Sequence, residues 1–249
     1  MPRYFIEVAY LGTNYSGFQV QKNANSIQSE IEKALHTVVK KEVKVTGSSR
    51  TDAGVHALQN YFHFDEDEVI DKKKVYNLNA VLPFDITVKS LSIVKPNAHA
   101  RFDAIAREYK YFISPQKNPF SVGKAWLYPY KINMQKLQKA AAILLEYNNF
   151  QSFSKKHTQV NNYLCTLQLS EWYYENDLLV YHVKGNRFLR GMIKGLVSTM
   201  LLVGRNKISE QDFIQIIEAN NNMQADFTAP SEGLFLCSVQ YPDEVFESK

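Results

Sequence analysis

The sequence predicts an α+β fold for its first hundred residues, and three observations support this prediction. Four segments rich in β-branched and aromatic residues have the pattern of strands, at residues 4–10, 43–46, 58–64 and 86–94. Two segments with helical apolar spacing interrupt them, near residues 26–38 and 71–82. The order strand, helix, strand, strand, helix, strand is compatible with a split βαβ sheet.

Each of the two helices has a start or stop signal. The first follows Asn25 or Ser26 as N-cap, and its apolar stripe begins at Ile27. The second begins near Asp71 and is expected to end near Pro83, because proline removes a helix hydrogen bond. Both helices are therefore expected to be short and amphipathic.

The second half of the chain also alternates between helices and strands. Strands are expected at 107–113, 164–172, 178–183 and 234–241, and helices at 134–147, 186–197 and from Ser209 onward. Residues 175–177, Glu-Asn-Asp, have the composition of a hairpin turn. No low-complexity linker interrupts the chain, so we expect two rigidly packed subdomains, at residues 1–103 and 104–249.

The segment Gly47–His56 lies between two predicted strands and is predicted to be a shaped loop, because glycines occur near both ends. If its backbone is extended, Arg50 and Asp52 point to the same side. Asp52 then has two interpretations. It either stabilises the turn, as Asp near Gly does routinely, or it is a carboxylate kept ionised beside a cation for acid-base or nucleophilic chemistry.

Composition limits the classes of function. With 45% hydrophobic and 22% charged residues in 249, the chain has the composition of a soluble globular protein. The formal charge of +4 permits a polyanionic partner. Two cysteines are too few for a disulfide framework or a four-cysteine zinc site. Neither a secretion signal nor a membrane-length apolar run occurs, so we expect a cytoplasmic protein with no membrane contact.

Several basic and aromatic positions are candidate RNA contacts. Tyr109 alternates with Arg107 on one face of a predicted strand and serves either as a stacking platform or in packing. His99 beside Arg101 is either a phosphate contact or a turn residue. The remaining basic candidates, chosen by charge clustering, are Lys22, Lys155, Lys156, Arg187 and Arg190.

The predicted helix 186–197 places Arg187, Arg190 and Lys194 on one face beside Gly191 and Gly195. Glycines four residues apart weaken a helix and are expected where another segment packs closely against its backbone. This face is either the floor of a groove or a solvated basic surface.

Six separated segments together resemble the TruA family, the tRNA pseudouridine synthases that act on the anticodon stem-loop. They occur in the family's order: Tyr10–Gln19, Arg50–Ala57, Ala98–Phe102, Tyr109–Tyr111, Asn186–Gly204 and Ala229–Leu236. The segment Arg-Thr-Asp-Ala-Gly-Val-His at residues 50–56 is highly specific. The others are individually weaker.

The resemblance implies a pseudouridine synthase fold, with two α+β subdomains on antiparallel, ferredoxin-like or RRM-like sheets joined around a central basic cleft. It also implies a homodimer that binds tRNA and isomerises uridine at tRNA positions 38, 39 and 40. No cofactor and no metal are implied.

The resemblance also assigns roles to individual residues. Asp52 corresponds to the catalytic aspartate, and Arg50 to the arginine that helps displace the target base. Tyr109 corresponds to the tyrosine that stacks on the extruded ring. Lys194 lies where the family commonly has an arginine paired with the aspartate; lysine supplies the charge but lacks the bidentate fork.

Three rival functions remain at this point. One is a related synthase acting on other RNA uridines, and another is an RNA-binding protein without catalysis. The third is a metal-dependent hydrolase that uses Asp52 with His56, His63 and His99. The spacing of these histidines lacks a compact ligand motif such as His-x-x-x-His, which disfavours the hydrolase.

Overall fold

The computed structural model describes residues 1–67, 69–71, 73–155 and 160–247, in two compact units. The first unit contains Met1–Ala106 together with Phe235–Lys249, and the second contains Arg107–Leu234. The expected boundary at residues 103/104 lies three residues before this division, and the C-terminal segment is grouped with the first unit instead of the second. The reason is strand pairing: the last strand pairs with β3 of the first unit.

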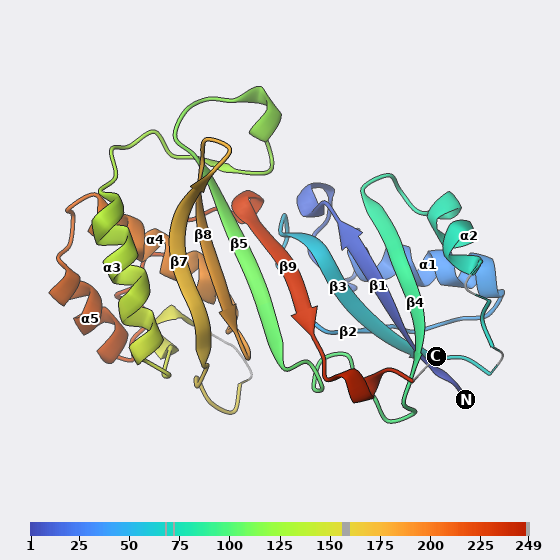
Figure 1. Cartoon of the computed structure of the whole chain (residues 1–249). Coiled ribbons are helices and arrows are strands. Elements are labelled where there is room, and N and C mark those ends of the chain that lie inside the picture. Colours follow the sequence, from blue (N-terminus) through green and yellow to red (C-terminus); the bar gives the residue numbers. More distant parts are fainter. Residues whose placement is uncertain (68, 72, 156–159, 248–249) are drawn as a thin grey trace. The chain divides into compact units, whose positions relative to one another are not determined.

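The first unit is a sheet with two helices on one face (Figure 1). Its strands follow the order β4 (Ile86–Val94), β1 (Arg3–Tyr10), β3 (His56–Asp65) and β9 (Leu234–Gln240), and β2 (Thr46–Gly47) pairs with β3. Helices α1 (Ile27–Val39) and α2 (Lys74–Val81) contact each other, and α2 contacts β4. Buried side chains on β1, including Tyr4, Ile6 and Val8, contribute to the core.

The sheet of the first unit is mixed rather than purely antiparallel. The pairs β1–β3, β1–β4 and β2–β3 are antiparallel, whereas β9 pairs with β3 in parallel, His56 opposite Phe235. The antiparallel prediction is confirmed for these three pairs, two of which join strands that are far apart in sequence. It is wrong for β9, which enters from the other unit after a long excursion of the chain.

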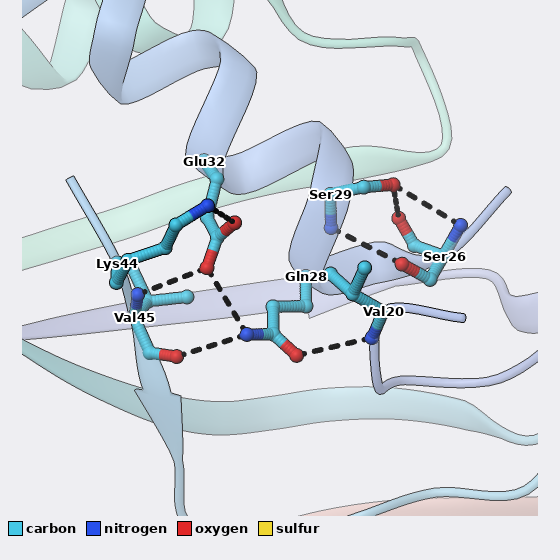
Figure 2. Close-up of polar contacts among 7 residues, drawn as sticks. All are labelled: Val20, Ser26, Gln28, Ser29, Glu32, Lys44 and Val45. Carbon is cyan, nitrogen blue, oxygen red and sulfur yellow. Dashed lines mark hydrogen bonds and ion pairs between the residues drawn. The ribbon is translucent and has the colours of Figure 1, made fainter. Parts of the chain in front are cut away.

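The expected strand at residues 43–46 is reduced to the two residues of β2. Val43 and Val45 are buried as expected of strand residues. The backbone of Val45, however, bonds to side chains of α1: its N–H donates to Glu32 Oε1 at 3.1 Å, and its carbonyl accepts from Gln28 Nε2 at 3.1 Å (Figure 2). Side chains thus take the place of strand partners here.

The second unit is a sheet packed with helices (Figure 1). Its strands follow the order β5 (Ala106–Ser114), β8 (Leu178–Gly185) and β7 (Leu167–Glu175), all antiparallel, and the short β6 (Trp126–Leu127) pairs with β5 in parallel. The helices are α3 (Met134–Ile143), α4 (Met192–Gly204) and α5 (Glu210–Glu218). Helix α3 contacts β7 and both other helices.

Local signals explain several element boundaries. Asn176 and Asp177 both adopt positive φ, at 50° and 63°, which gives the tight β7–β8 hairpin expected at that point. Ser209 and Asp212 form the capping box at the start of α5. Short 3-10 turns complete the chain, at Gly12–Asn14, Pro119–Ser121, Leu144–Glu146, Gln151–Phe153, Ser231–Gly233 and Asp243–Val245.

The helix expected from Asn186 begins six residues later than predicted, at Met192. Gly191 precedes it with a φ of +76°, in the left-handed region, so a continuous helix through this residue is excluded. Arg187 and Arg190 consequently lie before the helix, and the prediction that they share a helix face with Lys194 is wrong.

In the described part of the chain, no helix is both long enough and apolar enough to cross a membrane.

Candidate active site

The loop that carries Asp52 is anchored by the buried side chain of Asn60 on β3. Asn60 Oδ1 accepts from Ser48 Oγ at 2.7 Å, and its Nδ2 donates to the carbonyl of Ser49 at 3.2 Å and to the Tyr10 hydroxyl at 3.1 Å. The Tyr10 hydroxyl in turn lies 2.8 Å from Thr51 Oγ1. One amide therefore ties the residues on the N-terminal side of Asp52 to both β1 and β3.

On the other side of Asp52, the backbone closes a tight turn. The N–H of Val55 donates to the carbonyl of Asp52 at 3.1 Å, and Gly54 adopts a φ of +77°. The chain then enters β3 at His56, which is fully buried; its Nδ1 accepts from the N–H of Gly12 at 3.0 Å. Backbone bonds close this turn, and within it Asp52 is partly buried.

The segment after β1 packs directly on this turn. The N–H of Phe18 donates to the carbonyl of Thr51 at 3.0 Å. Gly17 has a φ of +101°, and a Cβ at this position would lie 3.1 Å from the Thr51 carbonyl oxygen. Gly12 is even closer, since its Cβ would lie 2.0 Å from the Val55 carbonyl oxygen. These glycines permit a backbone approach that a side chain would prevent.

Side chains of α1 bond to the segments that precede and follow it, at Val20 and at Val45 (Figure 2). Gln28 accepts from the N–H of Val20 at 3.1 Å and donates to Glu32 Oε1 at 3.0 Å, in addition to its bond with Val45. Lys44 contacts the other oxygen of Glu32 at 3.3 Å. The segments before and after α1 are thereby joined to the same helix. The first contacts the Asp52 loop through the bond from Phe18 to Thr51, and the second continues along the chain into that loop.

The predicted catalytic residues Arg50 and Asp52 therefore lie two positions apart on an immobilised loop. Arg50 is exposed, whereas Asp52 is partly buried. Backbone bonds, one of them to the carbonyl of Asp52, and the Asn60 side chain stabilise this turn.

In the second unit, Tyr109 lies on β5 opposite Val183 and is 9% exposed. Its ring meets Phe188 edge to face, with ring centres 5.2 Å apart. Tyr111, two residues on, is fully buried, and its hydroxyl donates to the carbonyl of Pro230 at 2.7 Å. Tyr111 is thus a core residue, whereas Tyr109 keeps a small exposed area and a neighbour that fixes the plane of its ring.

Lys194 lies in the first turn of α4, partly buried, and its Nζ donates to Ser231 Oγ at 3.3 Å. One turn later, Ser198 Oγ accepts from the N–H of Ala229 at 2.8 Å and donates to the carbonyl of Lys194 at 2.9 Å. The segment near Ser231 therefore runs along α4 and positions the lysine.

Both glycines of this region are closely covered, as their spacing predicts. A Cβ on Gly191 would lie 2.8 Å from Lys155 Cγ, and one on Gly195 would lie 2.9 Å from the ring of Phe227. Lys155 also donates its N–H to the carbonyl of Arg190 at 3.0 Å. The methylene stem of Lys155 thus packs across the residue that begins α4.

The other basic candidates differ in their surroundings. Arg187 donates to Asn162 Oδ1 at 3.1 Å, and Arg190 is exposed. Lys22 is exposed on a loop of the first unit. Lys156 lies outside the residues that the structure describes.

His99 and Arg101 lie in a tight turn of the first unit. His99 Nδ1 accepts from the N–H of Arg101 at 3.1 Å, and the N–H of His99 donates to Asp103 Oδ2 at 2.8 Å. His63 lies behind it, with ring centres 4.5 Å apart, and accepts from the N–H of Ala100 at 3.2 Å. The geometry of His99 is that of a turn residue, which favours the second of its two interpretations.

Burial, reinforced by the neighbouring His99 and Arg3, lowers the pKa of His63 to about 4. Burial likewise lowers the pKa of His99, although Asp103 opposes this effect. Both rings are therefore neutral near pH 7 and contribute no charge toward a phosphate.

The histidines of the proposed hydrolase site serve the backbone instead. His56, His63 and His99 each accept a backbone N–H at Nδ1. Across residues 1–67, 69–71, 73–155 and 160–247, no group of three or more His, Cys, Asp or Glu side chains is arranged to hold a metal ion.

The structure brings Arg50 with Asp52 onto one loop, and His99 with Arg101 onto one turn, all in the first unit. Tyr109, Lys155, Arg187, Arg190 and Lys194 belong to the second unit. Sequence reasoning missed the residues that position these groups, namely Ser48, Thr51, Asn60, Phe188 and Ser231. Ser48, Thr51, Phe188 and Ser231 lie in segments that the sequence analysis singled out, but their positioning contacts were not predicted, and Asn60 appeared only as an amide in a strand-like run of aromatic residues.

Comparison with known proteins gives one consistent result. The family model described as tRNA pseudouridine synthase matches residues 6–103 and 140–242. The chain is 46% identical to tRNA pseudouridine synthase A of Bacteroides fragilis over 248 residues, 98% of each protein. It is 40% identical to the protein of that name from Azobacteroides pseudotrichonymphae over the full length of both. The Staphylococcus aureus protein of that name is 36% identical, over 97% of this chain and 92% of its own length.

We predict that Gly17→Ala destabilises the first unit. The substitution forces an L side chain to a φ of +101° and against the Thr51 carbonyl, so the free energy of unfolding should fall by about 1–3 kcal/mol. Urea denaturation measures the change. The neighbouring Ser16→Ala, at an exposed position, is the control and should change stability by less than about 0.5 kcal/mol. Equal stability of the two variants would contradict the packing described for Gly17.

We also predict an acid-sensitive stability that depends on His63. Between pH 6.5 and 4, the unfolded chain gains a proton at this residue that the folded protein does not, so the free energy of unfolding falls as the pH falls. The contribution is about 1.4 kcal/mol per pH unit in this window. Urea midpoints at pH 7 and pH 5 should differ less in His63→Gln than in the unmodified protein. The same pH dependence in both would refute the assignment.

Proposed function

Since the chain belongs to the tRNA pseudouridine synthase family, we propose that it isomerises uridine to pseudouridine at positions 38, 39 and 40 of the tRNA anticodon stem-loop. The observation that carries this proposal is the Asp52 loop, because it holds a partly buried carboxylate two residues from an exposed arginine. The near full-length similarity to proteins named tRNA pseudouridine synthase A supports it.

The reaction breaks the bond between the ribose C1′ and N1 of uracil, turns the ring, and joins C1′ to C5. The proton on C5 is lost, and N1 gains one, so the isomerisation is redox-neutral and balanced. Asp52 is the group that attacks or deprotonates the nucleoside. A carboxylate on a rigid loop suits this step, because its position does not have to be organised during the reaction.

Arg50 and Tyr109 act on the position of the base. The target uridine must leave the stack to reach the enzyme, and the exposed Arg50 side chain would help to displace it. Tyr109 would then stack on the extruded ring. Its edge-to-face contact with Phe188 supports this role, since a fixed ring loses little conformational freedom when it stacks.

Lys194 would supply positive charge for Asp52 at the position where the family commonly has an arginine. Its contact with Ser231 and its place in the first turn of α4 limit its motion. A single ammonium group forms a less directional pair with a carboxylate than a guanidinium does.

The finer features that the resemblance implies are part of the same proposal. They are two ferredoxin-like or RRM-like subdomains around a central basic cleft, a homodimer, a cytoplasmic location, and tRNA backbone contacts by Arg101, Lys155, Lys156, Arg187 and Arg190. Exposure supports the role of Arg101 and Arg190. The neutral ring of His99 would position the turn rather than bind phosphate.

Two alternatives remain testable: a synthase acting on other RNA uridines, and an RNA-binding protein without catalysis. Release of tritium from C5-labelled uridine in tRNA distinguishes catalysis from binding. Mapping of pseudouridine in tRNA from cells lacking this gene then identifies the positions. Loss of pseudouridine at positions 38–40 alone is the expected result, and loss elsewhere would assign the other substrate.

We predict that Asp52→Asn abolishes pseudouridine formation but leaves tRNA binding intact. The amide is close in size but cannot act as a nucleophile or base, so kcat should fall by at least about 1,000-fold. Tritium release measures turnover, and filter binding measures the Kd for tRNA. Asp67→Asn, at an exposed acid of the same unit, should retain full activity. Normal turnover by Asp52→Asn would remove this residue from the mechanism.

We further predict that the charge of Lys194 is needed for turnover. Lys194→Gln should lower kcat by about 100-fold, the usual effect of removing one electrostatic group from an active site. Lys194→Arg should retain most activity, because it keeps the charge. Lys207→Gln, at an exposed lysine of the same unit, is the matched control for the loss of one positive charge. If all three variants behave alike, Lys194 has no special role.

A further inference from the structure

Phe102 is an exposed aromatic side chain at the end of the turn that contains His99. Its side chain is 73% exposed. Single exposed apolar residues are common on protein surfaces, so exposure alone indicates nothing. Phe102 differs in that its exposed ring contacts two neighbours, the His99 ring and the Arg101 guanidinium.

The first neighbour is His99, whose ring centre lies 4.2 Å from that of Phe102, with an angle of 36° between the planes. His99 is itself held by His63 and by the backbone of Arg101. Each ring in the series His63, His99, Phe102 thus fixes the next, and the series runs from a buried residue on β3 to the surface. The exposed ring has a rigid support.

Hydrogen bonds of the turn's backbone also hold Phe102 in place. The N–H groups of Phe102 and Asp103 both donate to the carbonyl of His99 at 3.1 Å, and Asp103 accepts from the N–H of His99. Ala100, within the turn, is fully buried, and its carbonyl accepts from the Tyr241 hydroxyl at 2.5 Å. A ligand that stacks on Phe102 would therefore lose little free energy to ordering of the protein.

The second neighbour is a cation. The Arg101 guanidinium carbon lies 5.7 Å from the centre of the Phe102 ring, and Arg101 is exposed. An exposed aromatic face beside an exposed arginine matches a nucleotide, whose base stacks and whose phosphate is negative.

We propose that Phe102 and Arg101 form a subsite for an unpaired nucleotide of the RNA substrate, with the base on the Phe102 ring and the phosphate at Arg101. This subsite rests on the proposed function for the identity of its ligand, an RNA with an unpaired region. It is a binding subsite and not part of the chemical step, so its loss affects KM and leaves kcat unchanged. An arginine–aromatic pair has no hydrogen-bond pattern that selects one base, so the subsite accepts any base.

The first test compares Phe102→Ala, Phe102→Tyr and Phe84→Ala in the full-length protein. Phe84 is fully exposed in the same unit, before β4, and controls for the loss of an exposed ring. Phe102→Ala should raise the Kd and the KM for tRNA about tenfold, with kcat within twofold of the unmodified value. Phe102→Tyr should restore both constants, and Phe84→Ala should change neither. An unchanged Kd in Phe102→Ala, or a fall in kcat alone, would overturn the subsite.

The second test reports stacking directly. In the Phe102→Trp variant, the tryptophan fluorescence of residue 102 is obtained by subtracting the emission of Trp126 and Trp172, measured in the unmodified protein. This fluorescence should be quenched by tRNA and by single-stranded RNA, but not by a fully paired RNA duplex. Equal quenching by the duplex, or none by tRNA, would overturn stacking on an unpaired base. Arg101→Gln should lower the slope of log Kd against log salt concentration by about 1, the value expected for the loss of one phosphate contact.

Two further outcomes separate this inference from its rivals. If Phe102→Ala lowers the oligomeric state in sedimentation velocity and leaves tRNA affinity unchanged, the surface binds a second copy of this chain and the subsite is wrong. If the unmodified protein releases no tritium but tRNA still quenches Phe102→Trp, the proposed catalysis fails while the subsite stands. If turnover is normal and quenching is absent, only the subsite fails.

Discussion

The geometry of the Asp52 loop depends on the hydrogen bonds of the Asn60 side chain. It is a buried amide in the middle of β3, and it bonds to Ser48, to the backbone of Ser49 and to the Tyr10 hydroxyl. Burying an amide is costly unless its hydrogen bonds are made, so the loop conformation that satisfies Asn60 is strongly preferred over others. The loop that carries the candidate carboxylate of Asp52 is thus held by a buried amide on β3.

The other candidate residues are also positioned by neighbouring groups. Backbone and small polar groups set positions, and the charged or aromatic side chain is left at the surface or partly buried. Lys194 is oriented by Ser231, and Tyr109 by Phe188. Phe102 is supported by His99, a neutral ring whose nitrogen serves the backbone. The three histidines that suggested metal chemistry accept backbone N–H groups instead, His56 from Gly12, and His63 and His99 from the single turn that contains Ala100 and Arg101.

Glycine positions explain how segments distant in sequence meet within each unit. Gly12 and Gly17 let the loop after β1 contact the backbone of residues 51–55, which no side chain could allow at these distances. In the second unit, Gly191 ends any continuation of α4 toward Arg187 and accommodates the stem of Lys155. A late helix start therefore changes which basic residues can act together, although their sequence spacing suggested a common face.

The sequence alone predicted the α+β class and most helices and strands, because periodicity and capping residues are local signals. Val45 was expected in a strand because residues 43–46 are rich in β-branched side chains, but α1 side chains bond to its backbone instead. The parallel pairing of β9 with β3 joins residues far apart in sequence, and no local pattern encodes it.

For the candidate site, too, some features follow from the sequence and others only from the tertiary structure. The motif around Asp52 marked it as the candidate catalytic residue, since residue type and order are properties of the sequence. The tertiary structure shows what holds the segment around that aspartate, namely the buried Asn60 side chain and the close approach of Gly17. Hydrogen-bond partners and exposure depend on atoms brought together by folding, so the sequence determined which residues were present and only the fold determined what each one contacts.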